Sequence, residues 1–252
     1  MDLNVILLAG GLGKRMNSTL PKVLHEVQGE PMLVKVIRQC LLLQPSHIFV
    51  VVGKFKHSIC DTMNQYLTSD QMNLVEFVLQ VPALGTGHAV QQCVPNLSKC
   101  EPTSSTLIVS GDTPLITFDT LSQFTIGQTD CRLLVTRFAD PFGYGRIIRD
   151  ANGEFVKIVE QKDCSTEEAK VDLCNSGIYL FNTGLLCSYV NQLTNNNAQK
   201  EYYITDLPEI LINELPYMNV DLLVLPTDRQ IELRGVNTEA QLKELNRQLN
   251  IF

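Results

Sequence analysis

The 252-residue chain contains no apolar run long enough to span a membrane. Its first apolar segment lacks the basic lead-in and the cleavage site of a secretory signal peptide. Lys and Arg number 20 against 27 Asp and Glu, and the resulting net charge of −7 argues against a protein that binds nucleic acid, since that task needs a broad basic excess. We therefore expect a cytoplasmic protein that binds neither membranes nor nucleic acid.

The eight cysteines form no recognisable metal-binding pattern. The sequence has no C-x-x-C pair and no His/Cys cluster with the spacing of zinc ligands. Several cysteines, such as Cys40 and Cys174, lie in apolar runs, where cysteine packs as a small hydrophobic residue. We expect reduced thiols with structural roles, as in a cytosol-like compartment.

The most informative segment is an apolar strand that runs directly into a glycine-rich, basic loop, VILLAGGLGKRM at 5–16, followed by Pro21-Lys22. Its three glycines within four residues allow the backbone to approach an anion closely and to direct several N–H groups at it. The first 25 residues carry Lys14, Arg15 and Lys22 against a single acidic residue, Asp2. The segment therefore predicts a polyphosphate-binding loop and a nucleoside triphosphate as ligand.

Two common phosphate-binding motifs do not fit this loop. A Walker A motif needs Ser or Thr after Gly-Lys, but Gly13-Lys14 is followed by Arg15. A Rossmann fingerprint that begins at Gly11 would need a small residue where Met16 stands. The remaining alternative to a phosphate site is an ordinary strand-to-helix turn with solvated basic residues.

Apolar runs alternate with helical patterns through the first half of the chain. We expect strands at 3–8, 47–52, 74–79, 106–110 and 131–136, and helices near 31–43, 54–67, 85–93 and 117–125. The early strands are apolar throughout, as expected when helices cover both faces of a sheet. This pattern predicts an α/β fold with a Rossmann-like, mostly parallel sheet, whose ligands gather at the carboxyl ends of the strands.

From about residue 139 the pattern becomes richer in strands. Segments 145–150 and 154–161 predict a hairpin, because Asn152-Gly153 between them is a turn signal. A segment at 204–215, a strand at 220–225 and a helix from Thr238 to Leu249 follow, with Thr238 as the expected N-cap. We expect a single domain over 1–252, with a nucleotide-binding half at about 1–138 and a half for a second substrate and closing elements at about 139–252.

The motif LxxGxGxRM, followed by PKVLH at 21–25, resembles the signature of the sugar-1-phosphate nucleotidyltransferases, and in particular of GlmU-type uridylyltransferase domains. The resemblance spans nearly the whole chain. Further matching segments occur in order at 84–89 (LGTGHA), 111–115 (GDTPL), 143–147 (GYGRI), 158–163 (IVEQKD), 175–179 (NSGIY), 195–206 (NNNAQKEYYITD) and 235–237 (GVN).

The resemblance implies the nucleotide-diphospho-sugar transferase fold and an Mg²⁺-dependent transfer of UMP from UTP to N-acetylglucosamine-1-phosphate. The products would be UDP-N-acetylglucosamine and pyrophosphate. One alternative is a pyrophosphorylase that acts on another hexose-1-phosphate, such as glucose-1-phosphate, or on dTTP. An alternative of another class is a nucleotide-sugar sensor that keeps the fold without catalysis.

Asp112 is the first candidate metal ligand, because it follows the apolar strand and is held between Gly111 and Thr113-Pro114. The alternative is a turn-forming or helix-capping aspartate. The resemblance implies that Asn237 is the second ligand of Mg²⁺, although a residue before Thr238 could equally belong to a helix cap. It further implies that Arg15 and Lys22 hold the phosphates and act in catalysis together with Asp112.

The resemblance also implies the residues that bind the two substrates. The nucleotide would contact Leu8, Ala9, Gly10, Gly11, Gly13, Lys22, Gln80, Gly85, Thr86, Ser110 and Gly111. Gln80, Gly85 and Thr86 would read the polar edge of uracil. The sugar would contact Gly145, Glu160 and Asn175, the alternative for Glu160 being a plain surface glutamate.

GlmU-type relatives usually continue into a left-handed β-helix of hexapeptide repeats, and no such repeats precede Phe252. We therefore expect neither acetyltransferase activity nor the trimer that this helix builds. A piece of a longer protein would have the same sequence, and the oligomeric state stays open.

Overall fold

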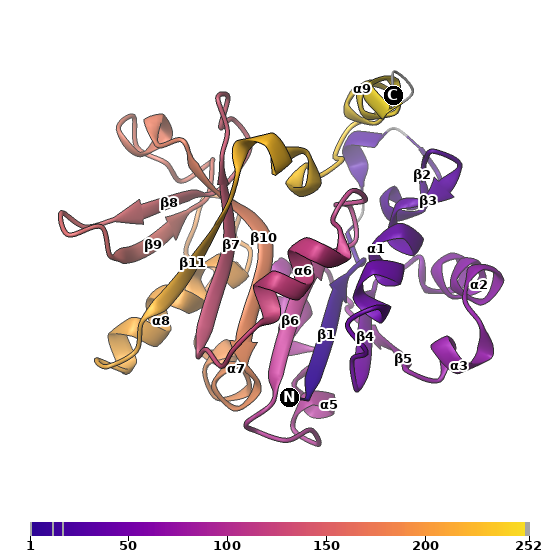
Figure 1. Cartoon of the computed structure of the whole chain (residues 1–252), viewed down its shortest axis with the longest axis horizontal. Coiled ribbons are helices and arrows are strands. Elements are labelled where there is room, and N and C mark those ends of the chain that lie inside the picture. The colour runs from indigo at the N-terminus through magenta and orange to yellow at the C-terminus, as the bar shows by residue number, and fades with distance from the viewer. Residues whose placement is uncertain (1, 12, 17, 250–252) are drawn as a thin grey trace.

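A computed structural model describes residues 2–11, 13–16 and 18–249. Within these residues the central sheet has nine strands (Figure 1). Its main path runs β11-β7-β10-β6-β1-β4-β5, and the β8–β9 hairpin joins it at β10. The strands are β1 (Leu3–Leu8), β4 (His47–Val52), β5 (Val75–Leu79), β6 (Ser105–Ser110), β7 (Cys131–Arg137), β8 (Arg146–Arg149), β9 (Phe155–Val159), β10 (Leu173–Asn182) and β11 (Val220–Leu225).

The predicted α/β fold with a mostly parallel central sheet is confirmed. Strand β1 pairs in parallel with β4 and β6, β4 pairs in parallel with β5, and β7 pairs in parallel with β11. The expected strands of the first half lie within a residue or so of the predicted bounds. The hairpin and the strand at 220–225 are also present.

The helices are α1 (Met32–Leu41), α2 (Lys56–Tyr66), α3 (Ser69–Met72), α4 (Thr86–Gln91), α5 (Val94–Leu97), α6 (Phe118–Thr125), α7 (Thr183–Tyr189), α8 (Leu207–Glu214) and α9 (Glu239–Leu249). Helices α1, α2, α4, α6 and α9 occur where they were predicted, whereas α3, α5 and α7 were not predicted. The Thr238 hydroxyl accepts a hydrogen bond from Gln241 N at 3.2 Å, which is the expected cap at the start of α9. No helix in the described part of the chain is both long and apolar enough to cross a bilayer.

Strand β10 was not predicted as a strand, and it is the longest in the sheet. It runs antiparallel to both β6 and β7 and lies between them. The polar run Asn175-Ser176-Gly177 interrupts its apolar pattern, and the register with β7 shifts between Asn175 and Ile178. Because β10 and β11 pair with strands of the first half, both halves share one sheet, and the functional division near residue 138 stays a prediction.

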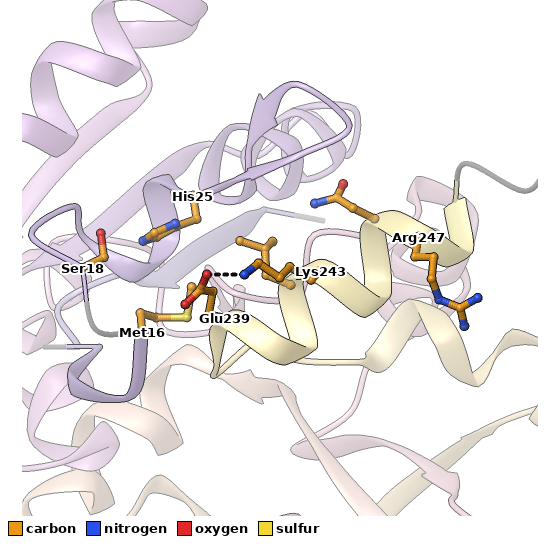
Figure 2. Close-up of a pocket in the computed structure, with 8 residues that line it drawn as sticks. Met16, Ser18, His25, Glu239, Lys243 and Arg247 are labelled. Atoms are coloured by element: carbon orange, nitrogen blue, oxygen red, sulfur yellow. Dashed lines mark ion pairs between the residues drawn. The ribbon is translucent and has the colours of Figure 1, made fainter.

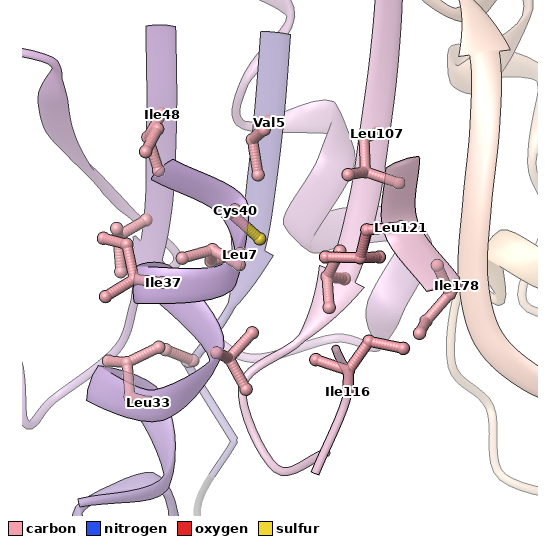
Figure 3. Packing of buried hydrophobic residues seen from close by; sticks show 14 of the residues in the cluster. Val5, Leu7, Leu33, Ile37, Cys40, Ile48, Leu107, Ile116, Leu121 and Ile178 are labelled. Carbon is pink, nitrogen blue, oxygen red and sulfur yellow. The ribbon is translucent and has the colours of Figure 1, made fainter. Parts of the chain in front are cut away.

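Two apolar clusters cover the two faces of the sheet. Side chains of β1 alternate between them, with Val5 and Leu7 in one cluster and Ile6 in the other. The first cluster packs the sheet against α1 and α6, as Figure 3 shows for Leu33, Ile37, Cys40 and Leu121. Coverage of both faces explains why these strands are apolar throughout. All eight cysteines are free thiols, as expected.

A buried carboxylate, Glu232, attaches the 3₁₀ segment η6 (Thr227–Leu233) to the start of α6. Its Oε2 accepts hydrogen bonds from Thr117 N, from Thr117 Oγ1 at 2.7 Å and from Thr120 Oγ1 at 2.6 Å. Its Oε1 accepts one from Arg229 Nε at 2.7 Å. Since η6 leads directly into 235–237, this carboxylate helps to set the position of Asn237.

We expect Glu232→Ala to lower the free energy of unfolding by about 3 kcal/mol, because three donor residues lose a buried, charged acceptor. Chemical denaturation followed by circular dichroism measures this change. Glu232→Gln is the matched control, since it keeps the side-chain volume and one acceptor, and we expect a smaller loss. If the Glu232→Ala variant had the same free energy of unfolding as the wild type, the anchoring role of Glu232 would be contradicted.

Candidate active site

The glycine-rich loop leaves the carboxyl end of β1 and is packed tightly against Lys22. Gly13 adopts a φ of +58°, and a Cβ there would lie 2.8 Å from the Lys22 Cβ. Its carbonyl oxygen accepts a hydrogen bond from Met16 N at 2.8 Å, which starts the short helix η1 (Lys14–Met16). A larger residue at 13 would therefore disturb both the loop and the lysine beside it.

Four predicted catalytic and metal-binding residues meet at this end of the sheet. The Lys22 ammonium donates to Asp112 Oδ2, and it also donates to Asn237 Oδ1 at 3.0 Å. Arg15 Nη2 donates to the same Asn237 oxygen at 3.1 Å. Asp112 and Asn237 are 90 and 215 positions away from Lys22 in the sequence. The fold thus gathers two cations, a carboxylate and an amide oxygen in one place.

Asp112 is held by both its side chain and its backbone. Ser110 Oγ donates to Asp112 Oδ1 at 2.7 Å, so Ser110, predicted to contact the nucleotide, supports the carboxylate in this structure. The Asp112 carbonyl accepts from Val236 N at 2.9 Å, which brings the segment of Asn237 next to the end of β6. Gly111, just before, donates its N–H to Leu8 O at 3.0 Å, so β1 and β6 stay paired up to the site.

The environment keeps Asp112 ionised. Burial by itself raises the pKa of this carboxyl, but the Lys22 ammonium and the hydrogen bonds from Lys22 and Ser110 outweigh burial and hold the pKa below its ordinary value. A buried carboxylate beside a movable ammonium can exchange that cation for another one. The role of Asp112 as a metal ligand stays a prediction.

On the predicted base side, the Gln80 side chain is buried and has a fixed orientation. Its Nε2 donates to Gly85 O at 2.8 Å and lies 3.2 Å from His88 Nδ1. Burial lowers the pKa of His88, consistent with a neutral ring that accepts at Nδ1. The Gln80 Oε1 therefore faces Gly10, where an added Cβ would lie 3.0 Å from it.

Thr86 lies close to Gln80 in the sequence, but its hydroxyl has a partner in the other half of the chain. Thr86 Oγ1 accepts a hydrogen bond from Ile204 N at 3.1 Å. The segment 195–206 matches the family pattern in the sequence, but the sequence does not indicate a role for its residues. Its contacts with 84–87 become visible only in the folded chain.

The three predicted sugar-binding residues also come together. A Cβ at Gly145 would lie 3.6 Å from both Glu160 Oε1 and Asn175 Cβ. Glu160 accepts a hydrogen bond from Thr205 Oγ1 at 3.1 Å, and Thr205 was not predicted to belong to the site. The Asn175 amide is engaged within the chain, with Nδ2 donating to Tyr179 Oη at 2.6 Å.

Glu160 is not a plain surface glutamate. Burial raises the pKa of its carboxyl, the Thr205 hydrogen bond opposes this rise, and the nearby Asp163 adds to it. A carboxylate that is partly withdrawn from water is suited to accept hydrogen bonds from hydroxyl groups.

A groove of about 590 Å³ lies beside the cluster, between the segment that follows the glycine-rich loop and α9 (Figure 2). It is lined by Met16, Ser18, His25, Glu239, Leu242, Lys243, Asn246 and Arg247. The two cations of α9 pair with glutamates of the same helix, Lys243 with Glu239 and Arg247 with Glu244. The groove was not predicted, and it does not include Lys22, Asp112 or Asn237.

The family model of the MobA-like NTP transferase domain matches residues 5–165, which include the loop, Lys22, Gln80 and Asp112. The chain belongs to this family. This NTP transferase is also 43% identical over 245 residues to a protein of Acanthamoeba polyphaga mimivirus named "Probable UDP-N-acetylglucosamine pyrophosphorylase", a match that covers 96% of the chain and 94% of the viral protein. The predicted relationship is confirmed.

Bacterial relatives are longer. The bifunctional protein GlmU of Burkholderia orbicola is 42% identical over 247 residues, which cover 97% of this NTP transferase and 51% of GlmU. The chain therefore spans about half the length of these bifunctional relatives. A solved structure of a "Putative Glucose-1-Phosphate Thymidylyltransferase" from Bacillus anthracis has a TM-score of 0.73 at 20% identity. The match covers 99% of this chain and 96% of the Bacillus anthracis chain. That likeness supports the fold.

We expect Lys22→Met to lower the free energy of unfolding by about 3 kcal/mol at pH 7, because Asp112 stays buried without its cation. In the wild type the depressed pKa of Asp112 stabilises the fold above the unfolded-state pKa, and this contribution is lost as pH falls. The loss in the variant should therefore shrink toward about pH 3. Denaturation across this pH range measures the difference. The double variant Lys22→Met/Asp112→Asn should recover stability at pH 7, and failure to recover would contradict the charge argument.

Glu160→Gln should have the opposite effect on the ligand-free protein. Because the pKa of Glu160 is raised in the folded protein, the fold favours the protonated carboxyl. The stabilisation from this carboxyl is present below its unfolded-state pKa and is lost as pH rises through its folded-state pKa. We expect the variant to melt a few degrees higher than the wild type at pH 8, with the gap closing near pH 4. Thermal denaturation at both pH values measures it, and a lower melting temperature at pH 8 would contradict the burial argument.

Proposed function

We propose that the chain transfers UMP from UTP to N-acetylglucosamine-1-phosphate in an Mg²⁺-dependent reaction that yields UDP-N-acetylglucosamine and pyrophosphate. The observation that carries this proposal is the convergence of Arg15, Lys22, Asp112 and Asn237 at the carboxyl ends of β1 and β6. The names of the viral and bacterial relatives support the choice of substrates. The eight free thiols favour a cytoplasmic setting.

The reaction needs no nucleophile from the chain. A phosphate oxygen of the sugar-1-phosphate attacks the α-phosphorus of UTP, the new O–P bond forms, and the bond to the bridging oxygen of pyrophosphate breaks. The chain contributes alignment and neutralisation of charge. In this mechanism the N–H groups of the loop around Gly11 and Gly13 face the phosphates, and Arg15 and Lys22 neutralise the charge that develops.

Asp112 and Asn237 fit an Mg²⁺ site. Their oxygens both contact the same Lys22 ammonium, so they can face one cation. No group of three or more His, Cys, Asp or Glu in the described ranges could hold a metal, so the other ligands would be phosphate oxygens and water, as Mg²⁺ prefers. When bound, Mg²⁺ would supply charge neutralisation for the triphosphate. Lys22 is then free to turn from Asp112 toward a phosphate.

The orientation of Gln80 favours a base with a donor at N3. Its Nε2 is occupied by Gly85 O, which leaves Oε1 as the acceptor beside Gly10. Uracil and thymine carry an N–H at position 3, whereas cytosine carries an acceptor there. The arrangement thus supports UTP or dTTP over CTP, and the relatives' names support UTP.

The position of Glu160 close to Gly145 and Asn175 supports a hydroxyl-rich second substrate. A Cβ at Gly145 would lie 3.6 Å from Glu160 Oε1, and Thr205 donates a hydrogen bond to the same oxygen. Hydrogen bonds from sugar hydroxyls to Glu160 would orient the sugar-1-phosphate toward the cluster around Asp112.

A substrate panel tests the proposal. We expect pyrophosphate release to show its highest kcat/KM with UTP and N-acetylglucosamine-1-phosphate, to be at least about tenfold lower with CTP because Gln80 then faces an acceptor, and to stop when EDTA removes Mg²⁺. Faster release with glucose-1-phosphate would contradict the sugar assignment. Equal kcat/KM with dTTP would contradict the assignment of UTP as the preferred nucleotide.

Asp112→Ala provides the internal control for this panel. We expect its kcat to fall about 10³-fold or more while the circular dichroism spectrum keeps its wild-type form. Asp61→Ala, at an exposed position of α2, is the matched control and should retain wild-type turnover.

A further inference from the structure

The predicted base-binding segment and the predicted sugar side are joined by a backbone seam. Gly87 N donates to Tyr202 O at 2.7 Å, and Tyr202 N donates to Leu84 O at 2.8 Å. Thr86 Oγ1 adds a third link by accepting from Ile204 N at 3.1 Å. The seam thus consists of 84–87 on one side and 202–204 on the other.

Two glycines make this close approach possible. A Cβ at Gly85, whose φ is +112°, would lie 2.5 Å from Tyr202 O, and a Cβ at Gly87 would lie 3.0 Å from the same oxygen. Real Cβ atoms essentially never show contacts under 3.0 Å. Glycine at positions 85 and 87 therefore allows the segment 202–204 to lie directly against the segment 84–87.

The position of Ile204 makes the Thr86 hydroxyl necessary. Ile204 is buried and is the first residue of η5 (Ile204–Asp206), so its N–H precedes the hydrogen bonds of that helix. Without Thr86 Oγ1 this N–H would lose the partner that the structure gives it. The next residue, Thr205, is also buried and donates to Glu160.

A continuous path therefore links the two subsites. Gln80 donates to Gly85 O, the adjacent Thr86 holds Ile204, and the adjacent Thr205 holds Glu160. The Thr86 hydroxyl oxygen accepts a hydrogen bond from Ile204 N, which belongs to the predicted sugar side. On the predicted base side, Gln80 Oε1 remains oriented toward Gly10.

On the basis of the function proposed above, we infer that Thr86 is a positioning residue for the sugar-phosphate subsite. Its hydroxyl acts through Ile204 and Thr205 on Glu160 and does not read the base. Loss of its acceptor should weaken binding of the sugar phosphate while the contact of Gln80 with the base persists.

Thr86→Val tests this inference, since it keeps the shape of the side chain and removes the acceptor. We expect the KM for N-acetylglucosamine-1-phosphate to rise about tenfold, as loss of one buried hydrogen bond predicts, and the KM for UTP to stay within about twofold. Thr86→Ser retains the hydroxyl and should restore both values. Thr62→Val is the matched control, because the Thr62 hydroxyl bonds within α2 to Ser58 O.

Two kinetic outcomes would overturn the inference. A higher KM for UTP with an unchanged KM for the sugar phosphate would assign Thr86 to the base, and unchanged values for both would show that the seam does not control the subsite. Should Thr86→Val fail to fold, Thr86→Ser and Thr86→Ala are compared by the same two KM values.

Amide hydrogen exchange of Ile204 in the ligand-free protein separates this inference from the proposed function. We expect Ile204 to exchange about tenfold faster in Thr86→Val than in the wild type and at the wild-type rate in Thr86→Ser. This measurement needs no substrate. A wild-type chain without turnover would refute the proposed reaction, whereas an unchanged exchange rate at Ile204 would refute the role of Thr86.

Discussion

The contact of one ammonium group with two oxygens is the constraint on which the site depends. Lys22 Nζ contacts Asp112 and Asn237, which belong to segments far apart in the chain. Burial of the Asp112 carboxylate would be unfavourable without this cation. The pKa of Asp112 is lowered because Lys22 and the hydrogen bonds outweigh the effect of burial. In the proposed mechanism, the same two oxygens would face Mg²⁺ once Lys22 turns to a phosphate.

The sheet makes this contact possible. Strands β1 and β6 are parallel neighbours, so the glycine-rich loop and Asp112 leave the sheet at the same edge. Asn237 reaches that edge because Glu232 fixes η6 to the start of α6 and because Val236 N bonds to the Asp112 carbonyl. Each of these anchors is a buried polar group with its partners satisfied.

Strand β10 connects the two halves of the molecule. It lies between β6 and β7 and carries Asn175 at its bulge, next to Gly145 and the hairpin that ends near Glu160. The seam between 84–87 and 202–204 provides a second connection on the base side. The cluster around Asp112 and the predicted sugar-binding residues therefore belong to one framework, which suits a reaction that joins two substrates.

The order of strands and helices in the first half, the phosphate-type loop and the candidacy of Asp112 followed from the sequence by itself, because local apolar periodicity and glycine spacing encode them. The tertiary structure alone decided the rest. Strand β10 was not predicted, because the polar residues at its bulge interrupt the apolar pattern. The partners of Glu232 at the start of α6 and the partners of Thr86 and Thr205 lie 45 to 118 positions away. No local pattern specifies such contacts, since they form only when distant segments pack together and their buried polar groups make hydrogen bonds with one another.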